Sequence, residues 1–269
     1  MKVLWRTDKR KDIVTCYMTA ITDVACANTQ NKKVKINKRI LGRISDYERG
    51  TLWKIWAKTE QYKNQFPNDM YGHLLSYDNC EFDVAIKKDL NRTFPEHAIF
   101  KDGAYAQKIL FNVLHAYAMY NPDVGYCQGM AFIAGMLVLY MNEEDAFFTM
   151  ISIMDKHNIK TLFLPQMRQL ERYCDVLDQY LRRKMKKLYA HMQQHGVDIT
   201  IVAAKWFMTL FTYNFSIETA ALLWDAILSM DDDWVLSIAI AIFKLMEVCL
   251  HGYKKNIYHA ERFNQRKPR

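Results

Sequence analysis

Apolar and polar positions follow one another along most of the chain with a period close to that of an α-helix. Long stretches keep this period without a turn signal, and only 9 glycines and 5 prolines interrupt the 269 residues. A hydrophobic content of 51% is enough to bury one large core or two closely packed lobes. The pattern therefore predicts a globular, all-α protein and disfavours β architecture.

Several helices can be placed from local signals. Residues 130–141, "MAFIAGMLVLYM", are apolar throughout but fall short of the roughly 18–20 residues that span a bilayer, so they predict a buried helix. Asn142 and Ser216 are predicted N-caps, because acidic residues follow each of them in the first helical turn. A last apolar helix is expected after the acidic run at 231–233. The basic run "RRKMKK" at 182–187 is predicted to be the solvated side of one helix.

The basic charge lies at the two ends of the chain. Of the formal +8, residues 1–40 carry +7 and residues 251–269 carry +5, which leaves residues 41–250 at −4. We predict one domain over residues 41–255, a basic and partly ordered extension at 1–40, and a basic tail at 256–269. Such ends suit an anionic membrane surface, nucleic acid, or simply solvent.

Other chemistry is weakly indicated. The six cysteines are scattered without a CxxC pair, and no signal peptide follows "MKVLWRTDKR", so we expect a reducing, cytoplasmic location. His191 and His195 have the spacing of a helical metal pair but no third ligand, so no metal site is expected. Cys127 has no basic neighbour in sequence and is not expected to be a nucleophile. Neither GxxxxGK[ST] nor GxGxxG is present, so the chain is not expected to bind a nucleotide by itself.

The stretch "IKKDLNRTFPEHAIF" predicts an arginine held rigidly near the end of a helix. Ile86, Asp89 and Arg92 follow one another at i, i+3 and i+6 of a predicted helix, so Asp89 and Arg92 are neighbours and can share an ion pair. Pro95 disfavours helical geometry at Phe94 and ends the helix within a turn of Arg92. The arginine can then project outward beside an acidic neighbour. The alternative is an ordinary surface ion pair that contributes about 0.5 kcal/mol.

The stretch "NPDVGYCQGM" presents a glutamine on a short loop framed by glycines. Asn121 and Pro122 mark a turn, while Gly125 and Gly129 permit positive φ or close backbone approach. The amide of Gln128 both donates and accepts, so it can orient a water molecule without changing charge. The alternative is a loop glutamine that makes a turn hydrogen bond.

Taken together, a guanidinium that neutralises phosphate charge and a carboxamide that aligns water are what stimulated GTP hydrolysis requires. At these residues the chain resembles the TBC-domain GTPase-activating proteins for Rab GTPases. The family's IxxDxxR and TFPxH pattern is matched at Ile86, Asp89, Arg92, Thr93, Phe94, Pro95 and His97. Its NPxxGYxQGM pattern is matched at Asn121, Pro122, Gly125, Tyr126, Gln128, Gly129 and Met130. An upstream RxxxW element is matched at Arg49 and Trp53, and a later WD pair at Trp224 and Asp225.

The resemblance implies a two-lobed, V-shaped helical domain whose groove receives a GTP-bound Rab. Arg92 would be the arginine finger and Gln128 a glutamine finger supplied in trans. Asp89 would orient Arg92, while Tyr126 and Gly129 would shape the loop and contact the partner. The resemblance assigns supporting or structural places to Phe94, Pro95, Arg49, Trp53, Asn121, Pro122 and Gly125. GTP and Mg²⁺ would arrive with the Rab, and the chain would need no cofactor of its own.

The resemblance runs from about Gly42 to about Cys249. Gly42-Arg43-Ile44 stands where the family often has Gly-Ile-Pro, and Leu222 precedes Leu223-Trp224-Asp225 without the family's arginine, but neither departure touches the fingers. The main alternative is a catalytically silent scaffold or effector of the same fold that binds a small GTPase or another partner. A nucleic-acid binder using the basic ends leaves both motifs unexplained, so no nucleic acid is expected.

Overall fold

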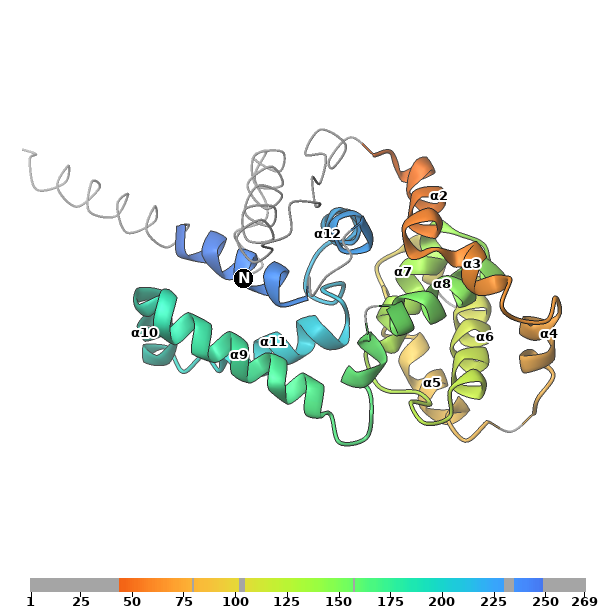
Figure 1. Cartoon of the computed structure of the whole chain (residues 1–269), viewed down its shortest axis with the longest axis horizontal. Helices are drawn as coiled ribbons and strands as arrows, with labels where there is room; N and C mark the ends of the chain where they lie inside the picture. The colour runs from red at the N-terminus through yellow and green to blue at the C-terminus, as the bar shows by residue number, and fades with distance from the viewer. Residues whose placement is uncertain (1–43, 79, 102–104, 157, 230–234, 249–269) are drawn as a thin grey trace, which may run out of the picture.

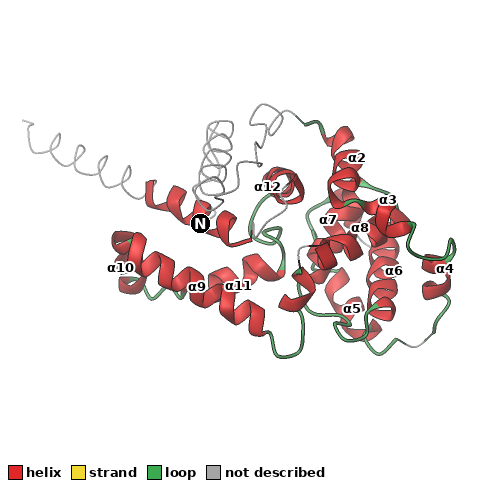
Figure 2. Ribbon diagram, in the orientation of Figure 1, coloured by secondary structure: helices red, strands yellow, loops and turns green. Residues whose placement is uncertain are grey.

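The computed structural model is described for residues 44–78, 80–101, 105–156, 158–229 and 235–248. Within these residues all regular structure is helical, which confirms the all-α prediction (Figures 1 and 2). The predicted extension at 1–40 and tail at 256–269 lie outside the described residues, as does the acidic run at 231–233. None of the described helices is long and apolar enough to cross a membrane.

The helices form two lobes that lie side by side (Figure 1). The first lobe contains α2 (Asp46–Ala57), α3 (Thr59–Lys63), α4 (Met70–Leu75), α5 (Asp83–Leu90), η1 (Ala98–Phe100), α6 (Tyr105–Tyr120), α7 (Met130–Tyr140) and α8 (Glu143–Lys156). The second contains η2 (Ile159–Leu162), α9 (Arg168–Lys184), α10 (Lys186–Gln194), α11 (Ile199–Met208) and the helical residues 235–248. Helix α12 (Ile217–Ser229) lies between them and contacts α2.

The centre of the first lobe is the packed group of α6, α7 and α8. Every residue of α7 from Met130 to Leu137 is buried, because this helix is apolar on all faces and is covered by its neighbours. The prediction of a buried helix is confirmed. Both N-caps are present as well: Asn142 Oδ1 accepts from the amide of Asp145 at 2.9 Å, and Ser216 Oγ accepts from the amide of Thr219 at 3.4 Å.

The prediction of a single helix through the basic run at 182–187 is wrong. Helix α9 ends at Lys184 and α10 begins at Lys186, because Met185 leaves helical geometry with φ −125° and ψ 48°. The break carries no glycine or proline. Leu181, Met185 and Leu188 are all buried, so packing of these side chains overrides local propensity at the break. The five basic residues of the run are exposed, as expected.

A buried ion pair joins α2 to α12. Arg49 Nε donates to both carboxylate oxygens of Asp225, at 3.1 and 3.2 Å, and its Nη1 donates to Asp46 on its own helix. Trp53 Nε1 donates to the same Asp225 at 2.8 Å, and its ring lies 5.4 Å from that of Trp224. The RxxxW and WD elements, 176 residues apart at Arg49 and Asp225, therefore meet as one cluster between the first lobe and α12.

Candidate functional site

Arg92 lies two residues beyond the last residue of α5. The chain leaves the helix through a turn in which the amide of Arg92 donates to the carbonyl of Asp89 at 3.3 Å. The Arg92 guanidinium Nη2 lies 2.6 Å from Asp89 Oδ1, so the ion pair expected from their spacing is present. The Arg92 side chain is 46% exposed and that of Asp89 only 10%. The hydrogen bond with Asp89 raises the pKa of Arg92, which keeps the side chain charged.

The residues that follow Arg92 fasten it to the core. Thr93 is fully buried, and its hydroxyl donates to the carbonyl of Asp89 at 2.8 Å. Phe94 has φ +47°, a left-handed conformation that is rare for a bulky residue. The helix that was expected to end at Phe94, before the exposed Pro95, already ends at Leu90. Thr93 and Phe94 pack against α7 at Gly135, whose missing side chain leaves them room. Arg92 therefore projects from a backbone that is held on both sides.

The glutamine loop connects α6 to α7. Asn121 accepts from the amide of Gly125 at 2.8 Å through its carbonyl, which closes the turn that the Asn-Pro pair predicted. Gly125 has φ +55° and Gly129 has φ +112°, so both glycines adopt conformations that other residues rarely do. A Cβ at Gly129 would lie 2.6 Å from the carbonyl oxygen of Met208 at the end of α11. The loop is thus pressed against the second lobe, and Gln128 is exposed on it.

One carboxylate connects the arginine to the glutamine loop. Asp89 Oδ1 accepts from Arg92, and Asp89 Oδ2 accepts from the Tyr126 hydroxyl at 2.6 Å. Burial and this hydrogen bond raise the pKa of Tyr126, so it remains a neutral donor. Tyr126 is two residues before Gln128. Arg92 and the base of the glutamine loop are therefore fixed relative to each other through a single buried group.

Cys127 and the pair of His191 and His195 are the remaining sequence candidates. Burial raises the pKa of the Cys127 thiol, which disfavours the thiolate that a nucleophile needs. The rings of His191 and His195 are 4.5 Å apart, but among the described residues no third potential ligand accompanies them.

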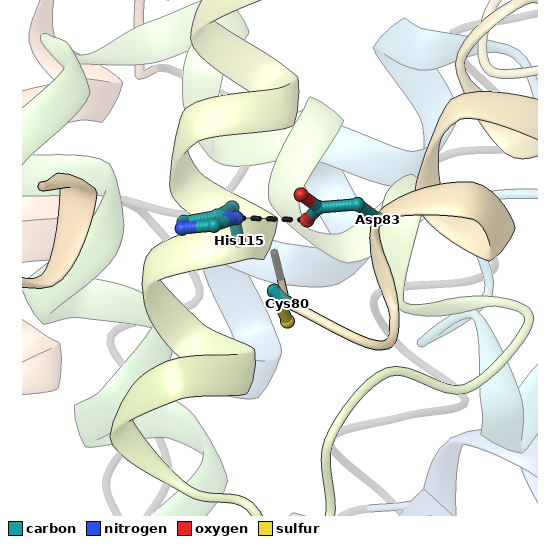
Figure 3. A group of neighbouring side chains, drawn as sticks. All are labelled: Cys80, Asp83 and His115. Atoms are coloured by element: carbon teal, nitrogen blue, oxygen red, sulfur yellow. Dashed lines mark hydrogen bonds and ion pairs between the residues drawn. The ribbon is translucent and has the colours of Figure 1, made fainter. Parts of the chain in front are cut away.

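A separate group, Cys80, Asp83 and His115, brings three potential metal ligands within 4.8 Å of one another (Figure 3). His115 Nδ1 lies 2.8 Å from Asp83 Oδ1 and is already hydrogen-bonded to it. The other ring nitrogen of His115 points away from Cys80 and has no partner in the described part of the chain. If His115 Nδ1 bound a metal, its Nε2–H would need a fixed acceptor, because metal-ligating histidines almost always donate their other N–H to one. We therefore assign this group a structural role, in which it joins the start of α5 to α6.

Two contributors to the site were missed by the sequence analysis. The ring of Phe82 fills the space beside Gly125, where a Cβ would lie 2.1 Å from Phe82 Cζ. Tyr213, in the turn after α11, packs its ring 5.2 Å from that of Phe132 at an angle of 83°. Neither residue has a sequence signal, because each acts through contacts between distant segments.

Comparison with known proteins identifies the family of this chain. The family model of the Rab-GTPase-TBC domain matches residues 46–250, and the chain belongs to this family. Rab GTPase-activating protein eat-17 of Caenorhabditis elegans is 36% identical over 189 residues, which cover 70% of this chain and 21% of that protein. Growth hormone-regulated TBC protein 1 of Mus musculus is 30% identical over 232 residues, which cover 79% of this chain and 65% of that protein.

Solved structures show the same fold. The flagellar RabGAP TBC domain of Chlamydomonas superposes with a TM-score of 0.67 at 20% identity, covering 92% of this chain and 84% of that one. The Ypt/Rab-GAP domain of Gyp1p superposes with a TM-score of 0.56 at 20% identity, covering 79% of this chain and 80% of that one. The chain spans only about a fifth of the length of eat-17, so it corresponds to one part of that longer relative.

Proposed function

We propose that this chain stimulates GTP hydrolysis on a GTP-bound Rab-family GTPase, with Arg92 and Gln128 both supplied in trans. The observation that supports this most is the shared carboxylate of Asp89, which binds the Arg92 guanidinium at 2.6 Å and the Tyr126 hydroxyl at 2.6 Å. A surface ion pair would not need a buried acceptor that also holds a second loop. A site that must present two groups at fixed separation does need one.

Each exposed group suits one part of the reaction. The Arg92 guanidinium can neutralise the charge that develops on the transferring γ-phosphoryl oxygens. The Gln128 carboxamide can accept from and donate to the attacking water, and so align it. GTP and Mg²⁺ belong to the partner, since the sequence holds no phosphate-binding glycine loop. The relatives named as Rab GTPase-activating proteins support the choice of a Rab as substrate.

Phosphate release from a panel of GTP-loaded Rabs, with and without this protein, tests the proposal. Acceleration of at least one Rab supports it and names the substrate. If one Rab binds in its GTP form but is not accelerated, the chain is a silent scaffold that has kept both residues. If no Rab is bound or accelerated, the proposed function is wrong and only a scaffold that binds another partner is left.

Gln128→Ala is expected to lower the stimulated rate by about 10²-fold or more, because the water loses the group that orients it. Binding of the GTP-loaded Rab should change little, since only one exposed amide is removed. The measurement is single-turnover phosphate release at saturating protein. Gln193→Ala, which removes an exposed glutamine of α10, is the matched control and should leave the rate unchanged. Equal rates for the two variants would remove Gln128 from the mechanism.

We also propose weak attraction of the basic ends to anionic membranes, where prenylated Rabs reside. The observation is the charge of +7 over residues 1–40, which lie outside the described structure. Sedimentation with anionic liposomes, compared between the full chain and a chain lacking residues 1–40, tests it. Equal sedimentation of the two would contradict it.

A further inference from the structure

The glutamine loop consists of two hydrogen-bonded turns. The first is closed by the amide of Gly125, which donates to the carbonyl of Asn121 at 2.8 Å. The second is closed by the amide of Met130, which donates to the carbonyl of Cys127 at 3.1 Å, and Gln128 lies inside this turn. A single residue joins the two turns. The position of Gln128 therefore depends on the direction in which the chain leaves Gly125.

The ring of Phe82 lies directly against Gly125. A Cβ on this glycine would be 2.1 Å from Phe82 Cζ and 2.5 Å from both of its Cε atoms, so the tip of the ring occupies the place of a side chain. Gly125 is buried although it belongs to a loop. Because glycine has more conformational freedom than any other residue, a loop that turns on a glycine at positive φ needs support from outside. The ring supplies that support.

Phe82 is itself held at the start of α5. Its carbonyl accepts from the amide of Ile86 at 2.9 Å, so the backbone of Phe82 is already part of the helix. The next residue, Asp83, binds His115 of α6 at 2.8 Å, and the His115 side chain is only 6% exposed (Figure 3). The structural pair of Asp83 and His115 thus fixes the backbone that carries the ring.

We propose that Phe82 is a positioning residue for Gln128, because its ring fixes Gly125 and thereby the turn that presents the carboxamide. This inference rests on the proposed function. The hydrogen bond of Tyr126 restrains a side chain of the loop but not the backbone at Gly125, so the ring adds a restraint that the bond does not give. Helix α5 then positions both exposed groups, Arg92 from its last turn and Gln128 from its first residue onward.

Phe82→Leu tests the proposal, because leucine stays apolar at this half-buried position but lacks the atoms that reach Gly125. The expected result is a single-turnover rate of stimulated GTP hydrolysis lowered about tenfold, with the affinity for the GTP-loaded Rab within about twofold of wild type. A misplacement of about 1 Å costs about 10²-fold, and the Tyr126 hydrogen bond limits the loss.

Phe66→Leu is the matched control for Phe82→Leu. Phe66 is also half-buried in the first lobe, where its ring lies 6.1 Å from that of Phe148 on α8, and its replacement should leave the rate unchanged. A rate for Phe82→Leu equal to that of Phe66→Leu would overturn the inference. So would a loss of affinity at an unchanged rate.

A substitution at Gly125 tests the same contact from the loop. Gly125→Ala introduces the Cβ that the ring excludes and should lower the rate at least tenfold. Gly196→Ala is its control: Gly196 has φ +64°, so the backbone strain is similar, but no atom of the described residues lies within 4 Å of the added Cβ. In the Phe82→Leu background, Gly125→Ala should cost less than in wild type. An equal cost in both backgrounds means that the ring does not hold the loop.

A measurement without a GTPase separates this inference from the proposed function. Gly125 and Gly129 are the only glycines preceded by valine and by glutamine, so ¹³C-carbonyl labels on those residues identify the two amides in ¹⁵N-glycine protein. Phe82→Leu should shift both signals, and Phe66→Leu neither. If both shift but wild type accelerates no Rab, the proposed function is wrong and the support of the loop stands. An unshifted Gly129 signal overturns the inference whatever the activity.

Discussion

Arg92→Ala is expected to slow stimulated GTP hydrolysis by about 10³–10⁵-fold, the range over which an arginine finger accelerates phosphoryl transfer. That loss corresponds to roughly 4–7 kcal/mol of activation free energy. The loss should fall on the rate at saturation, because the guanidinium meets developing charge in the transition state and adds little to ground-state binding. Single-turnover phosphate release from the Rab that wild type accelerates is the measurement.

Two further variants make the Arg92 result specific. Arg92→Lys should remain slow, because an ammonium on a flexible stem cannot keep the planar contact with Asp89 and reach the phosphate as the guanidinium does. Arg183→Ala removes an exposed arginine from α9 and should retain the wild-type rate. If Arg92→Ala stimulates GTP hydrolysis by the Rab as strongly as Arg183→Ala does, Arg92 forms only a surface ion pair and is not an arginine finger.

Asp225→Ala is expected to lower the free energy of unfolding by about 3–5 kcal/mol, the cost of leaving a buried charge without its partner. Asp225 is fully buried, and its removal leaves Arg49 Nε and Trp53 Nε1 without the oxygens to which they donate. Urea unfolding followed by circular dichroism measures the change as a lower midpoint. The expectation is wrong if the midpoint stays within error of wild type.

A matched acidic residue on the surface provides the control. On α9, Asp178 Oδ2 lies 3.9 Å from Arg182 Nη2, and the Asp178 side chain is 31% exposed and that of Arg182 67%. Asp178→Ala should change the free energy of unfolding by less than about 1 kcal/mol, because exposed pairs contribute little. The difference between the two variants measures what burial adds to the ion pair between α2 and α12.

The spacing of residues along the chain was sufficient to predict the ion pair between Asp89 and Arg92. Asp89 and Arg92 are three residues apart, and a helix or its final turn brings such residues together without help from the rest of the chain. The glycines of the glutamine loop gave its tight geometry. The position of Pro95 gave only a limit for the helix, which ends four residues before Phe94, at Leu90. These features are predictable because each depends on neighbours a few residues away.

Contacts between distant segments could not be found in the same way. The bond between Tyr126 and Asp89 spans 37 residues, and that between Arg49 and Asp225 spans 176. Which residues pair over such distances depends on how whole helices pack against one another. The helix break at Met185 and the positive φ of Leu210 were also not predicted. Neither position has a glycine or proline, the usual sequence signal for such geometry, and both side chains are buried in the core.

The packing at Gly135 bears on how relatives of this protein should be judged. A Cβ there would lie 3.0 Å from the ring of Phe94 and 3.1 Å from Thr93 Cγ2, so even alanine would push these residues outward by a few tenths of an ångström. The displacement would pass directly to Arg92, which immediately precedes Thr93 in the chain. If the proposed function holds, one neutral-looking change at this position of α7 would therefore abolish activity in a relative that keeps both Arg92 and Gln128. The two residues would then be necessary for activity without being sufficient, because the glycine behind Thr93 and Phe94 is needed to keep Arg92 in place.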